Sequence, residues 1–276
     1  MSSKWDKDYC AVLCSTHGNR SKITLTLIIV ILLAILGAAL GSFLNVLIWR
    51  LPREESIVFP GSHCGSCKKP IPFYLNIPII SYLILGGKCK YCGAKIHWHH
   101  FLVELITPLI LIGVFFRFGM FDVLFFKYAI LALWMIPIFF IDAFHQIIPH
   151  KLSIPLIPLG IIFALLPQND VGIMNALIAM VIIFCVLLLL AYVYKWVRKT
   201  DGLGGGDIWL LTGVSAFFGL ISLPYIVLIA SLLGILYFLV FIRNKDQSFA
   251  FGTFISFTVV LWILLGGESI LSFLAI

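Results

Sequence analysis

Long apolar stretches without charged side chains dominate this sequence. Residues 23–49 contain no Asp, Glu, Lys or Arg, and a helix of that length, at 1.5 Å per residue, crosses a hydrocarbon core of roughly 30 Å. Hydrophobic residues make up 62% of the chain and charged residues 11%, whereas soluble domains average about 45–50% and about 25%. The sequence therefore predicts an all-α, polytopic membrane helix bundle, and it excludes a soluble enzyme and a nucleic-acid-binding module.

About eight transmembrane helices are expected. A polar N-terminal tail (1–22) precedes the first transmembrane helix (23–49), a polar loop (50–100) follows it, and the rest of the chain (101–276) forms a transmembrane bundle. Seven further spans lie between polar or proline-containing breaks, at 101–117, 121–141, 151–167, 171–194, 207–223, 225–242 and 249–275. The break at Pro224 is the weakest of these.

Basic residues indicate which side of the membrane the polar loop faces. With eight spans both termini lie on one side, and the opposite side receives thirteen of the nineteen Lys and Arg residues: Arg50, Arg53, Lys68, Lys69, Lys88, Lys90, Lys95, Lys151, Lys195, Arg198, Lys199, Arg243 and Lys245. Because loops rich in Lys and Arg stay in the cytoplasm, we expect the polar loop inside. The four basic residues of the tail favour the opposite orientation.

The polar loop contains two Cys-x-x-Cys pairs, Cys64/Cys67 and Cys89/Cys92, with 21 residues between them. Each pair can bring two thiolates to one ion, and two pairs complete a tetrahedral, four-sulfur zinc site. The separation is slightly longer than the usual roughly 15–20 residues. We therefore predict structural zinc, without an open coordination position for catalysis.

Other ligands and cysteines leave alternatives open. His63, His97, His99 and His100 lie close to the cysteine pairs in the sequence, so one of them could replace a cysteine, or all could be solvated loop residues. Cys10 and Cys14 of the tail form an extracellular pair or remain unpaired thiols. Cys185 lies in an apolar span and is interpreted as packing.

Of the twelve acidic residues, nine lie in the tail, the polar loop, connections or near a span end, and three remain at or within the membrane: Glu104, Asp142 and Asp207. An ionisable group in the membrane is costly and by default indicates a functional site. Asp142 ends the third span and Asp207 opens the sixth, so the topology places both on the cytoplasmic side. Two neighbouring carboxyl groups share one proton, so that one can activate water while the other polarises an amide carbonyl.

Simpler roles exist for each of these acids. Asp207 could be a helix N-cap, Asp142 could pair with His145 or a loop lysine, and Glu104 could pair with a basic loop residue.

Three glycines directly before Asp207, namely Gly204, Gly205 and Gly206, favour a backbone that another chain approaches closely, such as an extended substrate.

An ordered set of motifs resembles the type IV prepilin peptidases, which are bifunctional leader peptidases and N-methyltransferases of bacteria. The elements that carry the resemblance are Gly41-Ser42-Phe43-Leu44-Asn45-Val46 with Arg50 and Pro52, both cysteine pairs, Asn76–Tyr82, Glu104-Leu105, Asp142 with Ile148-Pro149, Gly204-Gly205-Gly206-Asp207, and Phe251-Gly252. Two positions depart from the family pattern. Trp209 stands where the family usually has lysine, and Thr253 follows Phe251-Gly252 where the pattern has proline.

The resemblance implies a GxGD-type aspartic protease of the bacterial inner membrane. Its substrates would be type IV prepilins or pseudopilins with a short basic leader, cleaved after a glycine at the cytoplasmic face, with membrane lipid around the enzyme. The new N-terminal residue would then be N-methylated with S-adenosylmethionine. No glycine-rich nucleotide loop follows a strand, so the methyl-transfer site would be built near the polar loop, with Asn45, Arg50 and Glu104 as candidates.

Other functions remain open at this level. A transporter or channel also places acidic residues within the membrane, some relatives are expected to be peptidases without methyltransferase activity, and a zinc-stabilised docking protein would need no acids. The sequence does not indicate which pilin-like substrates are used, or the oligomeric state.

Overall fold

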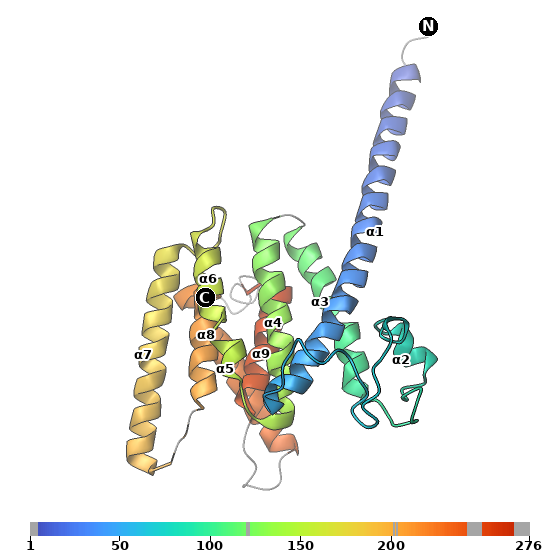
Figure 1. The fold of residues 1–276 in the computed structure, drawn as a ribbon. Helices are drawn as coiled ribbons and strands as arrows, with labels where there is room; N and C mark the ends of the chain where they lie inside the picture. Colours follow the sequence, from blue (N-terminus) through green and yellow to red (C-terminus); the bar gives the residue numbers. More distant parts are fainter. Residues whose placement is uncertain (1–4, 120–121, 201, 203, 242–249, 268–276) are drawn as a thin grey trace.

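The computed structural model describes residues 5–119, 122–200, 202, 204–241 and 250–267, without the side chains of residues 5–21 and 241 (Figure 1). Within these residues all regular elements are helices, and β-type pairing is limited to two isolated bridges in the polar loop. This confirms the all-α prediction. Cys10, Cys14, Arg243 and Lys245 lie outside the described side chains.

Long helices form most of the molecule. They are α1 (Trp5–Arg50), α3 (Trp98–Phe118), α4 (Val123–His145), α7 (Ile173–Arg198) and α8 (Gly205–Phe241). The shorter helices are α2 (Ile80–Ile84), α5 (His150–Ser153), α6 (Leu156–Leu165) and α9 (Phe251–Leu265), and two 3₁₀ turns, η1 (Leu51–Arg53) and η2 (Phe73–Leu75), lie in the polar loop.

Five described helices are long and apolar enough to cross a membrane. They correspond to Lys22–Arg53, Trp98–Phe118, Val123–His145, Ile173–Arg198 and Gly205–Val240. The apolar segments His150–Leu165 and Phe251–Leu265 are shorter. The chain is therefore a multi-pass helical membrane protein, and the count of eight spans stays a prediction.

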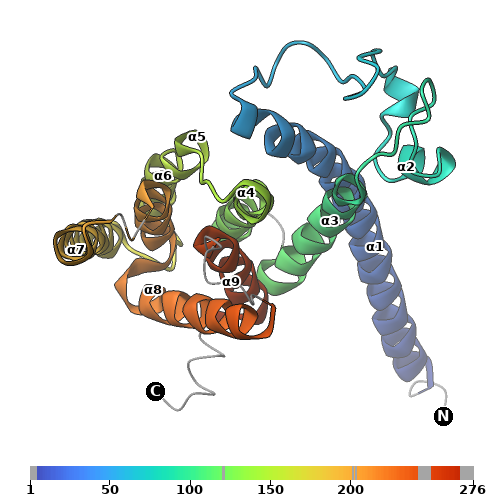
Figure 2. The ribbon, with the colours of Figure 1, turned by 90° about the horizontal axis from the view of Figure 1, so that it is seen from below.

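The break expected at Pro224 lies at Gly219 instead. Gly219 has φ 71° and ψ −172° inside α8, a conformation that is essentially restricted to glycine. A Cβ there would also lie 2.8 Å from Nδ2 of Asn175. The two parts of α8 run in different directions (Figures 1 and 2), whereas Pro224 sits just inside the second part.

Helix α4 lies at the centre of the bundle. In an apolar 18-residue stretch of α4, 67% of the residues are buried inside the protein, against 28% or less in the corresponding stretches of the other four candidate spans. Figure 2 shows α4 beside α9, with α3 and α8 around them and α7 at the outer edge. Because the lipid is apolar, the outward side chains of α7, such as Val181 and Leu189, are both hydrophobic and exposed.

Helices α1 and α3 approach each other closely at two glycines. A Cβ on Gly37 would lie 2.5 Å from Cα of Pro108, and one on Gly41 would lie 2.9 Å from Cα of Glu104. Small residues allow such close packing of membrane helices. This contact carries the polar loop, which leaves α1 and returns as α3, to the end of the bundle where α4 terminates (Figure 1).

Candidate active site and metal centre

Asp142 is buried near the C-terminal end of α4, with 4% of its surface exposed. Its Oδ2 atom accepts two hydrogen bonds from Thr253, one from the backbone N–H at 2.6 Å and one from the side-chain hydroxyl at 2.9 Å. Thr253 lies in the first turn of α9. The partner of Asp142 is therefore Thr253, and neither His145 nor a loop lysine forms an ion pair with it within the described residues.

Asp207 lies in the first turn of α8 and is half-buried. Its backbone N–H donates to the carbonyl oxygen of Gly204 at 3.1 Å. Its Oδ1 atom is buried and has no hydrogen-bond partner within the described part of the chain. Because a buried polar atom is normally paired, this oxygen has capacity for an incoming group.

The two aspartates come from separate helices and lie within electrostatic range of each other. The negative charge of Asp142 acts on the carboxyl group of Asp207 through space. The end of α4, which carries Asp142, and the start of α8, which carries Asp207, lie at the same end of the bundle (Figure 1). That these two acids act as a catalytic pair stays a prediction.

Ile148 connects the segments that carry the two acids. A Cβ on Gly206 would lie 2.7 Å from Cβ of Ile148, and one on Gly252 would lie 2.5 Å from Cδ1 of the same side chain. The Cβ on Gly252 would also come within 3.1 Å of Oδ2 of Asp142. Glycine at both positions lets α8, α9 and the segment after α4 meet beside the carboxylates.

The three glycines before Asp207 differ in their surroundings. Gly206 is packed against Ile148, and a Cβ on Gly204 would lie 2.9 Å from Oδ2 of Asp207. A Cβ on Gly205 would meet nothing within 4 Å. Gly204 and Gly205 are exposed, whereas Gly206 packs against the segment that follows α4.

The four cysteines of the polar loop form a compact group. Their Sγ atoms all lie within 4.8 Å of one another, and none of the described cysteines forms a disulfide. Within the described residues this group contains no histidine. A tetrahedral zinc ion with Zn–S bonds of roughly 2.3 Å separates its sulfurs by about 3.8 Å, and the Cys64 and Cys92 sulfurs are 3.8 Å apart. The residues therefore fit zinc.

Local turns orient these thiols. Each Cys-x-x-Cys pair lies between the two partners of an isolated bridge, His63 with Pro70 and Lys88 with Lys95. The backbone N–H of Cys67 donates to the Cys64 sulfur and lowers the pKa of that thiol to about 6. A lowered pKa favours the thiolate, which is the form that binds metal.

Asn45 of α1 and Glu104 of α3 each hydrogen-bond to a group outside their own helix. Asn45 donates through Nδ2 to the carbonyl oxygen of His100 at 2.9 Å, but its Oδ1 atom is buried without a partner in the described residues. Glu104 accepts from the backbone N–H of Ile79 at 2.7 Å and also from Ser42. The Ile79 contact joins Glu104 to the loop that carries the cysteines.

Arg50 has a different position from these two residues. Its guanidinium donates to three carbonyl oxygens of the polar loop, at 2.8 Å to Ser56, 2.6 Å to Pro60 and 3.2 Å to Gly61. Arg50 is 6% exposed. Its contacts are thus those of an anchor that fixes the start of the loop to the end of α1.

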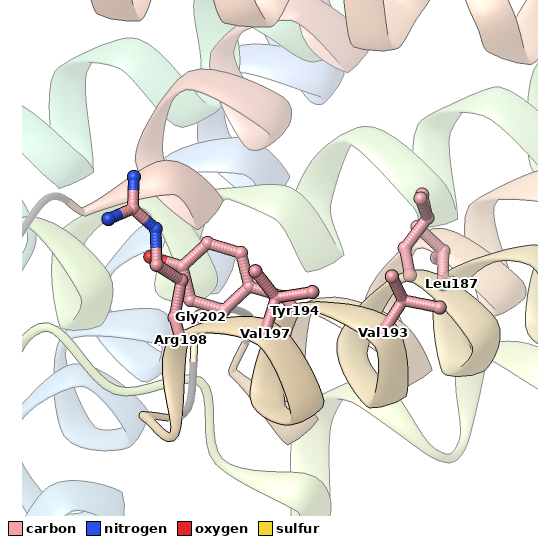
Figure 3. A pocket seen from close by; sticks show the side chains of 7 residues that line it. Leu187, Val193, Tyr194, Val197, Arg198 and Gly202 are labelled. Atoms are coloured by element: carbon pink, nitrogen blue, oxygen red, sulfur yellow. The ribbon is translucent and has the colours of Figure 1, made fainter.

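A hollow near the end of α7 is mainly apolar (Figure 3). Tyr194 and Arg198 lie beside Gly202, whose Cβ, if present, would meet the Tyr194 ring at 2.2 Å. The lining contains no acid, thiol or histidine. This hollow therefore offers no carboxylate or imidazole for acid–base chemistry.

Thr253 was not predicted from the sequence as a partner of Asp142. In the sequence it stands out only as a threonine where the family pattern has proline. The sequence could have indicated only that Thr253, if it lay in the first turn of a helix, would have a backbone N–H without an intrahelical partner. The carboxylate that accepts from this N–H is decided by the packing of α9 against α4, because Thr253 and Asp142 are 111 residues apart in the chain.

Comparisons with known proteins place this arrangement in a family. Residues 35–118 match the model described as the bacterial peptidase A24 N-terminal domain, and residues 129–239 match that of the type IV leader peptidase family. A protein of Neisseria gonorrhoeae named prepilin leader peptidase/N-methyltransferase is 34% identical, over 84% of this chain and 88% of its own length.

Proteins of the same name in Dichelobacter nodosus and Pseudomonas aeruginosa are 33% and 31% identical to this chain. They cover 83% and 86% of it, and 88% and 90% of their own lengths. No solved structure matches. The first family match contains the four cysteines and the second contains both aspartates. With this identity over most of its length, the chain belongs to the type IV leader peptidase family.

Proposed function

We propose that this protein removes the leader peptide of type IV prepilins or pseudopilins with Asp142 and Asp207, and then N-methylates the new N-terminal residue. The single observation that carries the peptidase proposal is the position of these two acids. They lie on different helices at one end of the bundle, where Gly206, next to Asp207, and Gly252, beside Asp142, both pack against Ile148. The relatives named above are called leader peptidases and N-methyltransferases.

Two neighbouring carboxyl groups supply both functions that peptide hydrolysis requires. The ionised carboxylate removes a proton from a water molecule as its oxygen attacks the scissile carbonyl carbon. The protonated carboxyl group donates to the carbonyl oxygen, where negative charge develops. The C–N bond then breaks, and the leaving amine takes a proton from the acid that deprotonated water. This sequence needs no metal at the reacting atoms.

The turn at Gly204 and Gly205 is a suitable place for an extended substrate. A side chain is absent at both positions, and a Cβ on Gly205 would meet no protein atom within 4 Å. A substrate backbone can therefore approach this segment without displacing a side chain. The prepilin helix would arrive laterally from the lipid, because the surrounding helices present apolar side chains outward.

The four-cysteine group is proposed as a structural zinc site. Zinc held by four thiolates has no open coordination position, so its contribution is to fold the loop over the α1–α3 contact. Cys64, Cys67, Cys89 and Cys92 would be the ligands. The loop is otherwise irregular, with only short helices and 3₁₀ turns, and a bound ion would order it.

Methyl transfer is proposed to take place between the polar loop and the ends of α1 and α3. S-adenosylmethionine supplies a methyl group on a positively charged sulfonium and also carries an amino group. Glu104 and the unpaired Oδ1 of Asn45 are acceptors that suit such a ligand. Arg50 would hold the loop in place through its three carbonyl contacts.

Both sites are proposed to face the cytoplasm. The polar loop, the end of α4 and the start of α8 lie at one end of the bundle (Figure 1). That end holds most of the lysine and arginine residues, and such loops remain in the cytoplasm. A prepilin leader, which is basic and stays on that side, would thus meet both sites.

Co-expression with a candidate prepilin tests the function directly. Mass analysis of the pilin N-terminus reads the cleavage position and methylation together. We expect the leader to be removed and one methyl group to be added in the presence of the wild-type protein, and an intact leader with Asp142→Asn. Unprocessed prepilin with the correctly inserted wild-type protein, across several candidate substrates, would contradict the proposal.

A further inference from the structure

The carboxylate of Asp142 closes the N-terminal end of α9. The first turn of a helix leaves backbone N–H groups without intrahelical partners. At α9 the N-cap residue is Ala250, whose side chain accepts no hydrogen bond. Asp142 fills this role from another helix, because its Oδ2 accepts the backbone N–H of Thr253. The Thr253 hydroxyl donates to the same oxygen.

This arrangement favours negative charge on Asp142. Hydrogen bonds to a carboxylate are stronger than those between neutral groups, and the N-terminal end of a helix carries a partial positive charge. Asp142 is only 4% exposed, so water cannot replace these donors. Without them, burial would favour the neutral acid.

Asp207 receives less support, because its carboxyl group accepts from one donor, the backbone N–H of Gly204, where Asp142 accepts from two on Thr253. It also lies in the first turn of a helix, α8, so the helix end favours its anion to some extent. However, its Oδ1 atom is buried and no described group donates a hydrogen bond to it. A protonated carboxyl group needs no donor and has a proton to give to a carbonyl oxygen. The hydrogen bonds therefore distinguish two otherwise similar acids.

We propose that Thr253 is a positioning residue that holds the negative charge on Asp142 and leaves the shared proton on Asp207. The inference rests on the aspartate pair of the proposed function and assigns a role to each member. Asp142 takes the proton of the attacking water, while the Asp207 proton moves to the scissile carbonyl oxygen. On collapse, the amine leaves with the proton from Asp142 and the hydroxyl proton returns to Asp207, so one water is consumed per bond.

Both donors belong to Thr253, which lies outside the residues that match the family models. Its contact with Asp142 is thus a feature of this structure, and the family resemblance alone does not provide it.

Three substitutions in the full-length protein separate positioning from packing. Thr253→Val removes the hydroxyl donor but keeps the shape and the backbone N–H, and Thr253→Ser keeps both donors. Thr258→Val is the matched control, because Thr258 is buried on the same helix and its hydroxyl has no described partner. Each purified protein is assayed with a prepilin that the wild type cleaves, and kcat, KM and the melting temperature are measured.

The expected result is a fall in kcat of about tenfold or more for Thr253→Val, the loss that one hydrogen bond to a charged group represents. KM and the melting temperature should stay close to the wild-type values, and Thr253→Ser and Thr258→Val should keep the wild-type kcat. If Thr253→Val does not fold, Thr253→Ala removes the same hydroxyl with a smaller side chain, and the same loss is expected.

Two results would overturn the inference. One is wild-type kcat in a folded variant without the hydroxyl, and the other is an equal loss of kcat in Thr253→Ser and Thr253→Val. With either result, the proposed function of the aspartate pair still stands if Asp142→Asn is inactive. Cleavage by Asp142→Asn would instead contradict the proposed function itself, so the two failures are distinguishable.

Discussion

Gly206 and Ile148 lie in direct contact beside the two aspartates, and a Cβ on Gly206 would come within 2.7 Å of Cβ and 2.9 Å of the carbonyl oxygen of Ile148. The start of α8 therefore touches the segment that follows α4 at a point where no side chain fits. This contact fixes how far apart the helices that carry Asp142 and Asp207 can stand.

Gly206→Ala is expected to separate these segments and abolish most of the leader cleavage. Forcing a methyl group into a packed contact costs about 1–3 kcal/mol, so the melting temperature should also fall. Gly205→Ala is the control, because its Cβ would meet nothing within 4 Å, and its melting temperature should be unchanged. Equal thermal stability and cleavage in Gly206→Ala and the wild type would show that the contact does not matter.

Metal analysis of the purified protein is expected to give about one zinc per chain. Replacement of Cys64, Cys67, Cys89 or Cys92 by serine removes one of four thiolate ligands, so the bound zinc should be lost. Cys185→Ser is the control, because Cys185 is exposed on α7, away from the cluster, and it should retain the metal. Metal-free wild-type protein, prepared without chelators, would remove the zinc proposal and leave the peptidase proposal in place.

Lys127 and Asp170 form a second polar contact, at the other end of α4. Lys127 is 1% exposed and Asp170 is 37% exposed, and Tyr128 donates to the same carboxylate. Asp170→Asn removes the negative charge beside the buried Lys127 ammonium group, which should lower the free energy of unfolding by roughly 3–5 kcal/mol. Lys127→Met leaves a carboxylate that water can reach, so it should cost less.

Thermal unfolding in detergent measures this asymmetry. Asp170→Asn should lower the melting temperature more than Lys127→Met, and the double substitution should recover part of the loss. Because the pair stands at the opposite end of α4 from Asp142, correctly folded variants should still cleave prepilin. A larger fall in melting temperature in Lys127→Met than in Asp170→Asn would contradict the interpretation that the buried Lys127 charge depends on Asp170.

Glu104→Gln is expected to remove methylation and preserve leader cleavage. Glutamine keeps an acceptor for the Ile79 N–H but removes the charge that is proposed to face the cationic methyl donor. The mass of the processed pilin should then equal that of the cleaved, unmethylated form. Glu54→Gln, at an exposed position of the polar loop, serves as the control and should leave methylation intact. Full methylation with Glu104→Gln would exclude a role for this charge.

The sequence predicts the architecture well where hydrophobicity alone decides it. The apolar span 121–141 corresponds closely to α4 (Val123–His145), and the uncharged stretch 23–49 ends one residue before α1 does. Helix α1 begins at Trp5, however, within the segment that was expected to be a polar tail. The spacing of the cysteine pairs likewise predicts a four-sulfur group, because local turns fix each pair. These features depend on composition and short-range geometry, both of which can be read from the chain.

Features that depend on tertiary contacts were not predicted. The break in α8 lies at Gly219, beside Asn175 of α7, because the close contact there requires a residue without a Cβ. Thr253 reaches Asp142 only through the packing of α9 against α4. Neither contact leaves a periodic signal in the sequence, so a single chain without its fold does not reveal them.

Single-turnover cleavage of a purified prepilin by Asp142→Asn and by Asp207→Asn tests the central claim most directly. Asp122→Asn is the matched control, because Asp122 caps the opposite end of α4 and asparagine also caps helices well. We expect each of the first two variants to insert and fold but to release no leader, and Asp122→Asn to cleave at the wild-type rate. Substantial leader release by either Asp142→Asn or Asp207→Asn would contradict an active site made from this pair.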